Sequence, residues 1–495
     1  MSKQGIGIDF GTTNSIVASF NGKDEIRAYR NVEDNLPHPS VVWYKADGAK
    51  TVGREAKRNI EGFSHQEGNR FIKSVKRFLG KNRDYVIFGE NKPAFHVASD
   101  IFSFLSSNFS KQNSDQSIES AVVTVPIYFD GFARRDIRKA ADRAGIYIKK
   151  FVHEPFAAVI GYYYRKDNLL RFDGLENHKI LVFDWGGGTL DITITKIENG
   201  NIYELATNAM NDRAGDFFDK KICDFAKTQF VAHNYLSPAY VDIAPANMDR
   251  LIEACEWAKI RLSVEEQYPV RVYGIIDADG ELLNMNEKIT RRDFNELIKS
   301  TIKEAKTKIM QALEAAEITS AEIHQVLLIG GTSRIPLVID TLNEMFGHRV
   351  RELENADSII AEGAAIIDFF ELQPILAKPV HVELSNGELY TVLPRDLEAN
   401  SLTCTKEINF FCTDNRDGTA NLVITGPNRH KREFLSIPVD PTITKGFHET
   451  VKVNFNLDAD MILKVSGRGE TQDFGNSIEI YDMNFGLRLN REDEI

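Results

Sequence analysis

IGIDFGTTNS at residues 6–15 returns in altered form as LVFDWGGGTLD at residues 181–191. Each copy is an apolar strand that ends in an aspartate and an aromatic residue, followed by a Gly/Thr turn and a second apolar strand. Such a turn exposes backbone N–H groups and hydroxyls without bulky side chains, which suits a phosphate. Asp9 and Asp184 add hard oxygen atoms that suit a magnesium ion or its bound waters. The duplication predicts two similar lobes that close on one nucleotide.

The composition is that of a globular protein with more than one domain. A chain of 495 residues exceeds what one hydrophobic core supports, so we expect two or three domains. The net charge of −12 argues against a general nucleic-acid binder. No apolar run approaches the roughly 18 residues of a membrane span, and the first strand begins too early to leave room for a signal peptide. Four cysteines do not make a disulfide framework in so long a chain, although Cys404 and Cys412 could face each other across a hairpin. We therefore expect a cytoplasmic protein with no nucleic-acid or membrane partner.

The first 371 residues alternate β-branched strands with amphipathic helices, which predicts an α/β architecture. The longest expected helix opens at Thr290, because Thr290 and Asp293 have the spacing of a capping box. The expected helices cover residues 101–109, 134–144, 248–262 and 290–317.

The chain changes character after residue 371. Pro374 and Pro379 exclude a regular helix from residues 372–380, which we expect to be a linker. Short alternating runs separated by Asn-Gly, Asp-Gly and Gly-Pro turns then predict an all-β domain over residues 381–489. We expect residues 490–495 to be a charged tail.

A third glycine turn, LLIGGTSRIP at residues 327–336, follows another apolar strand. Backbone at Gly330 and Gly331 can approach a flat base or ribose closely, and Arg334 could stack or pair there. The sequence contains no GxxxxGK[ST] loop, no HExxH and no GxSxG, and its early glycines are misplaced for GxGxxG. These absences leave the repeated aspartate–glycine turns as the nucleotide signal.

Seven ordered motifs resemble those of the 70-kilodalton heat-shock chaperones of the DnaK type, within the actin and sugar-kinase ATPase superfamily. The resemblance covers the first 370 residues. It implies a two-lobed, actin-like α/β ATPase that converts ATP and water to ADP and phosphate. The motifs are GIDFGTTNS at 7–15, VKR at 75–77, VTVPIYF at 123–129, HEPFAA at 153–158, DWGGGTLD at 184–191, GGTSRIP at 330–336 and EGAA at 362–365.

The resemblance also implies catalytic roles for the matching residues. Lys76 would orient the attacking water, and Glu154, Thr189 and Asp191 would complete the polar shell around it. Asp9 and Asp184 would hold Mg²⁺ through its waters, so ATP or ADP and Mg²⁺ are the implied cofactors. Taken alone, Lys76 would be an ordinary solvated lysine.

The nucleotide-binding residues implied by the resemblance come from the three turns and from one helix. On that helix Glu256, Lys259 and Ser263 are spaced i, i+3 and i+7, so they share one face, although alone they read as a surface pair and a serine. Pro126 and Arg134 match a pair that relays nucleotide state between domains. The expected ATP-binding set is Gly11, Thr12, Thr13, Asn14, Gly186, Gly187, Gly188, Thr189, Gly215, Asp216, Glu256, Lys259, Ser263, Gly330, Gly331, Thr332, Ser333 and Arg334.

The resemblance continues more thinly beyond the linker. Residues 451–466 look like the closing strands of the family's peptide-binding β-sandwich. Such a domain holds an extended peptide by backbone hydrogen bonds and one apolar pocket. Each candidate pocket residue could equally belong to the sandwich core, since half of strand positions face inward. The candidates are Val382, Leu384, Phe410, Ala420 and Leu422.

The sequence departs from the family pattern in several places. It ends after the β-domain, so no C-terminal helical lid is expected, and fast peptide exchange would follow. Pro374 stands about where the family's acidic linker has an aspartate, which puts stimulation by J-domain proteins in question. Ser385 and Ala420 are smaller than the family's usual cleft residues, and Ala214 replaces a glycine near a phosphate-side turn.

The preferred hypothesis is an ATP-dependent chaperone that binds unfolded or extended polypeptide segments, with ATP hydrolysis gating affinity. The implied partners are therefore polypeptides, together with a J-domain protein and a nucleotide-exchange factor. The missing lid and altered linker keep a second hypothesis open, a nucleotide-gated regulatory scaffold that docks one dedicated partner protein. A sugar kinase is disfavoured by the β-domain and by the sequence of the third turn.

Overall fold

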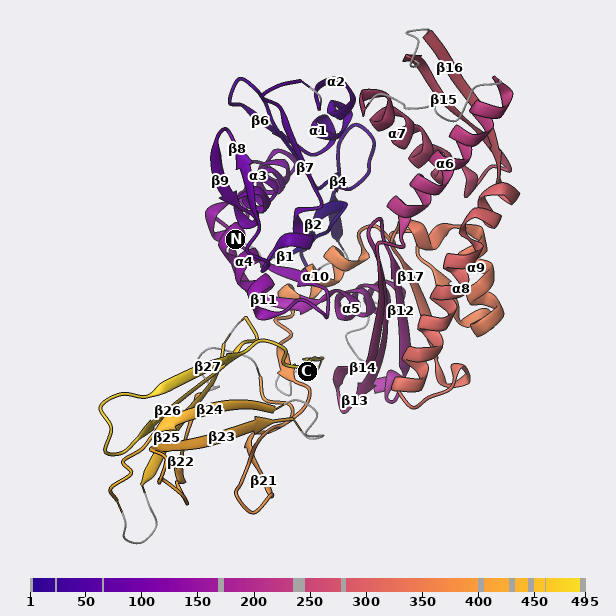
Figure 1. Cartoon of the computed structure of the whole chain (residues 1–495). Coiled ribbons are helices and arrows are strands. Elements are labelled where there is room, and N and C mark those ends of the chain that lie inside the picture. Colours follow the sequence, from indigo (N-terminus) through magenta and orange to yellow (C-terminus); the bar gives the residue numbers. More distant parts are fainter. Residues whose placement is uncertain are drawn as a thin grey trace.

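The computed structural model describes residues 3–22, 25–64, 66–167, 173–234, 245–276, 282–398, 405–426, 432–443, 449–458 and 460–489. Figure 1 shows two α/β lobes side by side, with a β-sandwich below them. Cys404 and the predicted charged tail lie outside the described residues.

The first lobe is built on a mixed sheet with the order β11-β10-β1-β2-β3, with β4 also paired to β2. Strands β1 and β2 form the predicted strand–turn–strand unit and pair antiparallel, while β10 and β11 extend the sheet in parallel. Helices α3 and α4 pack on this sheet, and a smaller sheet with two short helices forms the tip of the lobe. The elements are β1 Gly5–Phe10, β2 Asn14–Phe20, β3 Ile26–Tyr29, β4 His38–Pro39, β5 Val41–Tyr44, β6 Lys50–Val52, α1 Arg54–Arg58, α2 Ile60–Phe63, β7 Arg70–Lys73, η1 Val75–Phe78, β8 Asp84–Ile87, β9 Glu90–Pro93, α3 Ala94–Gln112, β10 Ser120–Val125, α4 Gly131–Arg143 and β11 Tyr147–His153.

The second lobe repeats this plan around a seven-stranded sheet with the order β18-β17-β12-β13-β14-β28-β19. The second predicted strand–turn–strand unit is β12 and β13, and β17 runs parallel to β12. A helical tip with one hairpin rises above this sheet (Figure 1). The elements are β12 Lys179–Trp185, β13 Thr189–Glu198, β14 Asn201–Asn211, α6 Gly215–His233, α7 Pro245–Leu262, β15 Gln267–Ile276, β16 Leu282–Thr290, α8 Arg291–Ala315, β17 Gln325–Ile329, η5 Gly331–Arg334, α9 Pro336–Phe346 and β18 Val350–Glu352.

Two helices, α5 (Glu154–Asp167) and α10 (Ile359–Phe369), fill the space between the two large sheets. They cross closely at Gly363, where an added Cβ would lie 1.8 Å from the carbonyl oxygen of Ala157. Nearly all of α10 is buried, which explains its run of isoleucine and alanine. This shared apolar core joins the two lobes at their base.

The predicted helices are confirmed, although three begin earlier than expected, as α3, α4 and α7. Helix α8 starts where predicted, because the Thr290 side chain accepts from the Asp293 N–H and the Asp293 carboxylate accepts from the Thr290 N–H.

The β-domain is a sandwich of two four-stranded antiparallel sheets, with the orders β21-β20-β23-β24 and β22-β25-β26-β27. Along β25 the buried residues Val451, Val453, Phe455 and Leu457 alternate with partly exposed ones, as expected for a strand of a sandwich. The predicted Asn-Gly and Asp-Gly turns are present, since Gly387 and Gly418 have φ values of 80° and 73°. The strands are β20 Val380–Glu383, β21 Leu389–Leu393, β22 Thr405–Phe411, β23 Thr419–Thr425, β24 Arg432–Pro438, β25 Thr450–Leu457, β26 Leu463–Gly469 and β27 Asn476–Ile480.

The expected boundaries of the linker and sandwich need a correction. β19 (Pro374–Leu376), inside the predicted linker, and β28 (Phe485–Arg488), inside the predicted sandwich, both join the sheet of the second lobe. β28 pairs with β14 on one side and with β19 on the other. Leu487 is 1% exposed and packs among residues of the core between the lobes. The chain therefore enters and leaves the sandwich through two strands that are paired with each other.

The sandwich also contacts the first lobe, through helix α4. The buried Arg134 guanidinium donates to the carbonyl oxygens of Asp460, at 2.6 Å, and of Met461 and Tyr481, both at 3.1 Å. The ring of Tyr481 stacks on Phe132, with centroids 3.9 Å apart. The β-domain therefore touches both lobes of the α/β domain.

Candidate nucleotide and catalytic site

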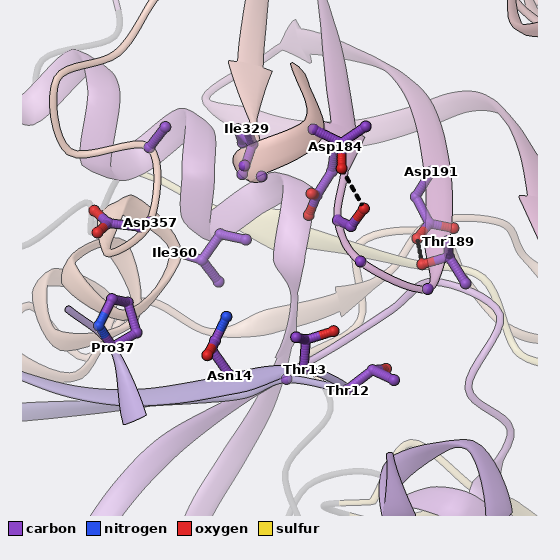
Figure 2. Close-up of a pocket in the computed structure, with 18 of the residues that line it drawn as sticks. Thr12, Thr13, Asn14, Pro37, Asp184, Thr189, Asp191, Ile329, Asp357 and Ile360 are labelled. Atoms are coloured by element: carbon purple, nitrogen blue, oxygen red, sulfur yellow. Dashed lines mark hydrogen bonds between the residues drawn. The ribbon is translucent and has the colours of Figure 1, made fainter. Parts of the chain in front are cut away.

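A cavity of about 320 Å³ lies between the two lobes, where the strand–turn–strand units face each other. Figure 2 shows Thr12 and Thr13 of the first unit across the cavity from Asp184, Thr189 and Asp191 of the second. All six residues predicted to be catalytic line this cavity: Asp9, Lys76, Glu154, Asp184, Thr189 and Asp191.

The two repeated turns come into direct contact at the centre of the cavity. A Cβ added to Gly187 would lie 2.5 Å from the Thr13 hydroxyl oxygen, so the two turns pack closely at this point. The side chains of Asp184 and Asp191 are brought together because the two residues are partners in the β12–β13 register. The duplicated sequence thus places two Gly/Thr turns and their aspartates around one space.

The third turn closes the cavity from the side of the second lobe. Gly330 has φ of 77°, and a Cβ there would lie 2.5 Å from the Trp185 carbonyl oxygen. The Thr332 hydroxyl donates to the Gly186 carbonyl oxygen at 2.8 Å, which fixes the third turn to the second. Gly331 and Thr332 therefore line the cavity, as predicted.

Short polar contacts order the end of the cavity where Lys76, Glu154 and Asp191, predicted to be catalytic, lie, and we call this the catalytic end. The Lys76 ammonium lies 2.7 Å from the Glu154 carboxylate, and their side chains are 5% and 13% exposed. The Thr189 hydroxyl donates to Asp191 at 2.9 Å, a contact visible in Figure 2. Asp9 accepts from the Thr124 hydroxyl at 3.1 Å. One buried lysine thus faces several carboxylates.

The carboxylates of the catalytic end resist ionisation. Burial, with the nearby charge of Glu154, raises the pKa of Asp9 to about 6 and that of Asp191 to about 7. Burial raises the pKa of Asp184 as well, and Glu154 and Asp191 add to the effect. Lys76 opposes these shifts, yet a single positive charge does not balance the cluster. The site therefore favours additional positive charge.

This electrostatic deficit fits the implied magnesium ion. Among the described residues no three His, Cys, Asp or Glu side chains converge closely enough to ligate a metal directly. Mg²⁺ commonly keeps several waters and binds through one or two carboxylates plus substrate phosphates. Asp9 and Asp184 are suitably placed for such outer contacts, since both line the cavity beside the two Gly/Thr turns.

The cavity is also lined by the predicted face of α7, through Glu256 and Lys259, and by Ser263, which directly follows that helix. Burial opposes ionisation of Glu256, but Lys57 of the first lobe, 2.8 Å away, outweighs burial and lowers the pKa of Glu256. Lys259 pairs with Asp219 at 2.8 Å inside the second lobe. The Lys57–Glu256 pair therefore bridges the two lobes beside the cavity, which Glu256 lines.

Three predicted ATP-binding residues do not line the cavity: Gly215, Ser333 and Arg334. Arg334 instead donates to the carbonyl oxygens of Leu353 and Glu354, at 3.4 and 3.1 Å. The Ser333 hydroxyl donates to the Gly330 carbonyl oxygen and so supports the third turn from behind. Gly215 acts through its backbone, because its carbonyl oxygen accepts from Lys259.

Other lining residues were given no role from the sequence. Most of them are apolar or lie far apart in the chain, so no local pattern marks them. Tyr128, Ile329 and Ile335 stood inside quoted motifs but were assigned no role. These residues are Ile16, Pro37, Tyr128, Ile260, Ile329, Ile335, Ala356, Asp357 and Ile360.

The sequence model of the family described as Hsp70 protein matches residues 5–93 and 84–370 of this chain. That span includes every predicted catalytic residue and both lobes apart from strands β19 and β28. The chain belongs to the Hsp70 family. Hsp70 proteins are nucleotide-dependent chaperones whose members are ATPases that bind ATP and ADP. Within the described residues, no helix has the length and apolar character needed to cross a membrane.

The residues expected to act outside the nucleotide cavity have distinct environments. Pro126 lines the cavity, whereas Arg134 lies at the contact with the sandwich. In the sandwich, Val382 and Leu422 are buried in the core, while Leu384, Phe410 and Ala420 are partly buried against it. Val382 and Leu422 are therefore core residues of the sandwich. Leu384, Phe410 and Ala420 keep part of their apolar surface accessible.

Proposed function

We propose that this Hsp70-family protein hydrolyses ATP in the cavity between its lobes and uses the nucleotide state to set the affinity of its β-domain for extended polypeptides. The observation that carries the proposal is the convergence of all six predicted catalytic residues, from both lobes, on one cavity. Binding of ATP, ADP and Mg²⁺ at the named residues is part of this proposal.

The proposed chemistry is attack of water on the γ-phosphorus, with cleavage of its bond to the β–γ bridging oxygen to give ADP and phosphate. Lys76, held by Glu154, would orient the water, and Thr189 and Asp191 would complete its hydrogen bonds. The backbone N–H groups of the two turns would bind the phosphates. Such positioning and charge stabilisation supply most of the catalysis in phosphoryl transfer. When bound, Mg²⁺ would neutralise charge on the β- and γ-phosphates.

Gating of the β-domain is supported by its contacts with both lobes. Arg134 and Phe132 hold it to the first lobe, and β28 holds it to the second. A change in the angle between the lobes would therefore act on the sandwich from two sides. Pro126 lies at the nucleotide cavity and is followed by the segment that leads into α4, so it is suited to transmit such a change.

The client half of the proposal is tested by titrating fluorescent unfolded peptides in ATP and in ADP. We expect binding in both states, with different affinity. Phe410→Ser should weaken binding, whereas Phe411→Ser, on the neighbouring outward position and 61% exposed, should not. Absence of binding in either nucleotide would refute the client role.

One observation favours a second function, the nucleotide-gated scaffold for a dedicated partner. The paired β19 and β28 anchor both ends of the sandwich in the second lobe, which limits the movement that ATP could produce. Affinity capture from the native cell extract separates the two functions. One stoichiometric partner would support the scaffold, and many unrelated polypeptides would support the chaperone.

A further inference from the structure

A second cavity, of about 520 Å³, adjoins the catalytic end of the nucleotide cavity. The two cavities share Thr12, Lys76, Tyr128 and Thr189. In Figure 2 Thr12 and Thr189 lie at one end of the nucleotide cavity, with Pro37 and Asp357 at the other. The second cavity therefore begins where the γ-phosphate of the proposed function would be cleaved.

The second cavity runs from this shared end to the protein surface. Its outer wall includes Lys81, Asn211 and Asp212, which are all exposed. Its inner wall is formed by η1 and by the segment that leads into α4. It thus connects the catalytic end with solvent without passing the α7 face, where Lys57 and Glu256 bridge the lobes.

Arg77 spans this second cavity. Its guanidinium pairs with Asp212 of the other lobe at 2.9 Å. It also lies against the phosphate turn, because a Cβ added to Gly188 would be 2.1 Å from its Nη2 atom. Its Nε atom is buried and has no hydrogen-bond partner among the described residues. A guanidinium with a spare donor beside a phosphate turn is suited to bind a phosphate in bidentate fashion.

We propose that the second cavity is the exit path of inorganic phosphate and that Arg77 is the phosphate's first binding partner on the way out. The inference rests on the proposed ATP hydrolysis. Phosphate that leaves the catalytic end would replace Asp212 on the Arg77 guanidinium and then pass Lys81 to solvent.

Equilibrium binding of inorganic phosphate to the ADP-bound protein tests the role of Arg77. Arg77→Gln removes the cation and is expected to weaken phosphate binding roughly tenfold or more. Asp212→Asn removes the carboxylate that competes for Arg77 and is expected to strengthen it. Equal affinity in the wild type and both variants would overturn the assignment. This measurement does not require hydrolysis, so it tests the inference even if the proposed ATPase activity fails.

A plug at the outer wall tests the path itself. In Asn211→Trp, free phosphate detected by a fluorescent phosphate-binding protein is expected to lag behind phosphate detected after acid quench. Asn286→Trp, at an exposed position of the β16 hairpin, should show no added lag. Release that follows hydrolysis equally in both variants would overturn the path, whereas absence of phosphate after quench would instead refute the proposed function.

Discussion

The strand that returns from the sandwich should contribute to the stability of the second lobe. Leu487→Ala tests this, since Leu487 is 1% exposed in the core between the lobes and is flanked by β14 and β19. Truncation of a fully buried leucine costs about 2–5 kcal/mol of unfolding free energy. We expect a loss in that range. The control Leu36→Ala, at a position 43% exposed, should change the unfolding free energy by about 0.5 kcal/mol or less.

Urea denaturation followed by the fluorescence of buried Trp185 measures the free energy of unfolding of the second lobe. The protein used carries phenylalanine in place of Trp43 and Trp257, so that Trp185 alone reports. Gly486→Val provides a second variant, because its Cβ would lie 2.6 Å from the Ile202 carbonyl oxygen and should break the β14–β28 pairing. If Leu487→Ala matched the Leu36 control, β28 would not be part of the lobe, and the corrected domain boundary would be wrong.

Three further predictions concern charge. Folding favours the protonated forms of Asp9 and Asp191, whose pKa values are raised to about 6 and 7, so their contribution to stability is present below about pH 4 and is lost as pH rises through 6 to 7. Magnesium favours the ionised forms of these carboxylates. In calorimetry of the ADP-bound protein, magnesium should therefore raise Tm more at pH 8 than at pH 5.5. An equal rise at both pH values would contradict the electrostatic account. Arg134→Ala leaves buried carbonyls of the sandwich without their hydrogen-bond donor, which costs about 1–3 kcal/mol for each carbonyl. Hydrogen exchange of residues 460–481 should therefore accelerate far more than in Arg135→Ala, whose side chain is 38% exposed. Equal exchange in the two variants would contradict the docking role of Arg134. Lys57→Ala removes the partly exposed ion pair with Glu256, so it should speed ADP release only about two- to fivefold. Stopped-flow measurement of ADP release tests this. Release at the wild-type rate would show that the ion pair does not hold the lobes together.

The repeated turns were predictable because their information is local. Asp9, Thr13, Asp184 and Gly187 stand at strand ends whose spacing is visible in the sequence, and the duplication indicated that they meet. The capping box at Thr290 was equally local. Lys76 and Glu154 required the family resemblance, since a lysine and a glutamate carry no pattern of their own.

The remaining site depends on tertiary packing that no short pattern encodes. Pro37, Asp357 and Ile360 come from distant segments and meet only when the lobes assemble. Arg334 was placed at the base because of its position in the third turn, but nearby backbone carbonyls hold its side chain outside the cavity.

The final strand illustrates a different limit. Phe485, Leu487 and Leu489 alternate with period two, so a strand was readable, but its partner strand β14 lies far away in the chain. A strand's sheet is set by edge pairing and burial, which a short run of sequence does not reveal.

The most direct test of the central claim is acid-quenched, single-turnover hydrolysis of ATP by the wild type, Lys76→Ala and Thr189→Ala. We predict that the wild type forms stoichiometric ADP and phosphate, and that both variants fold and bind ATP but hydrolyse it slower by about a hundredfold or more. Glu67→Ala, exposed at the tip of the first lobe, should retain the wild-type rate. Unchanged hydrolysis in both site variants would contradict the assignment of the cavity between the lobes as the catalytic site.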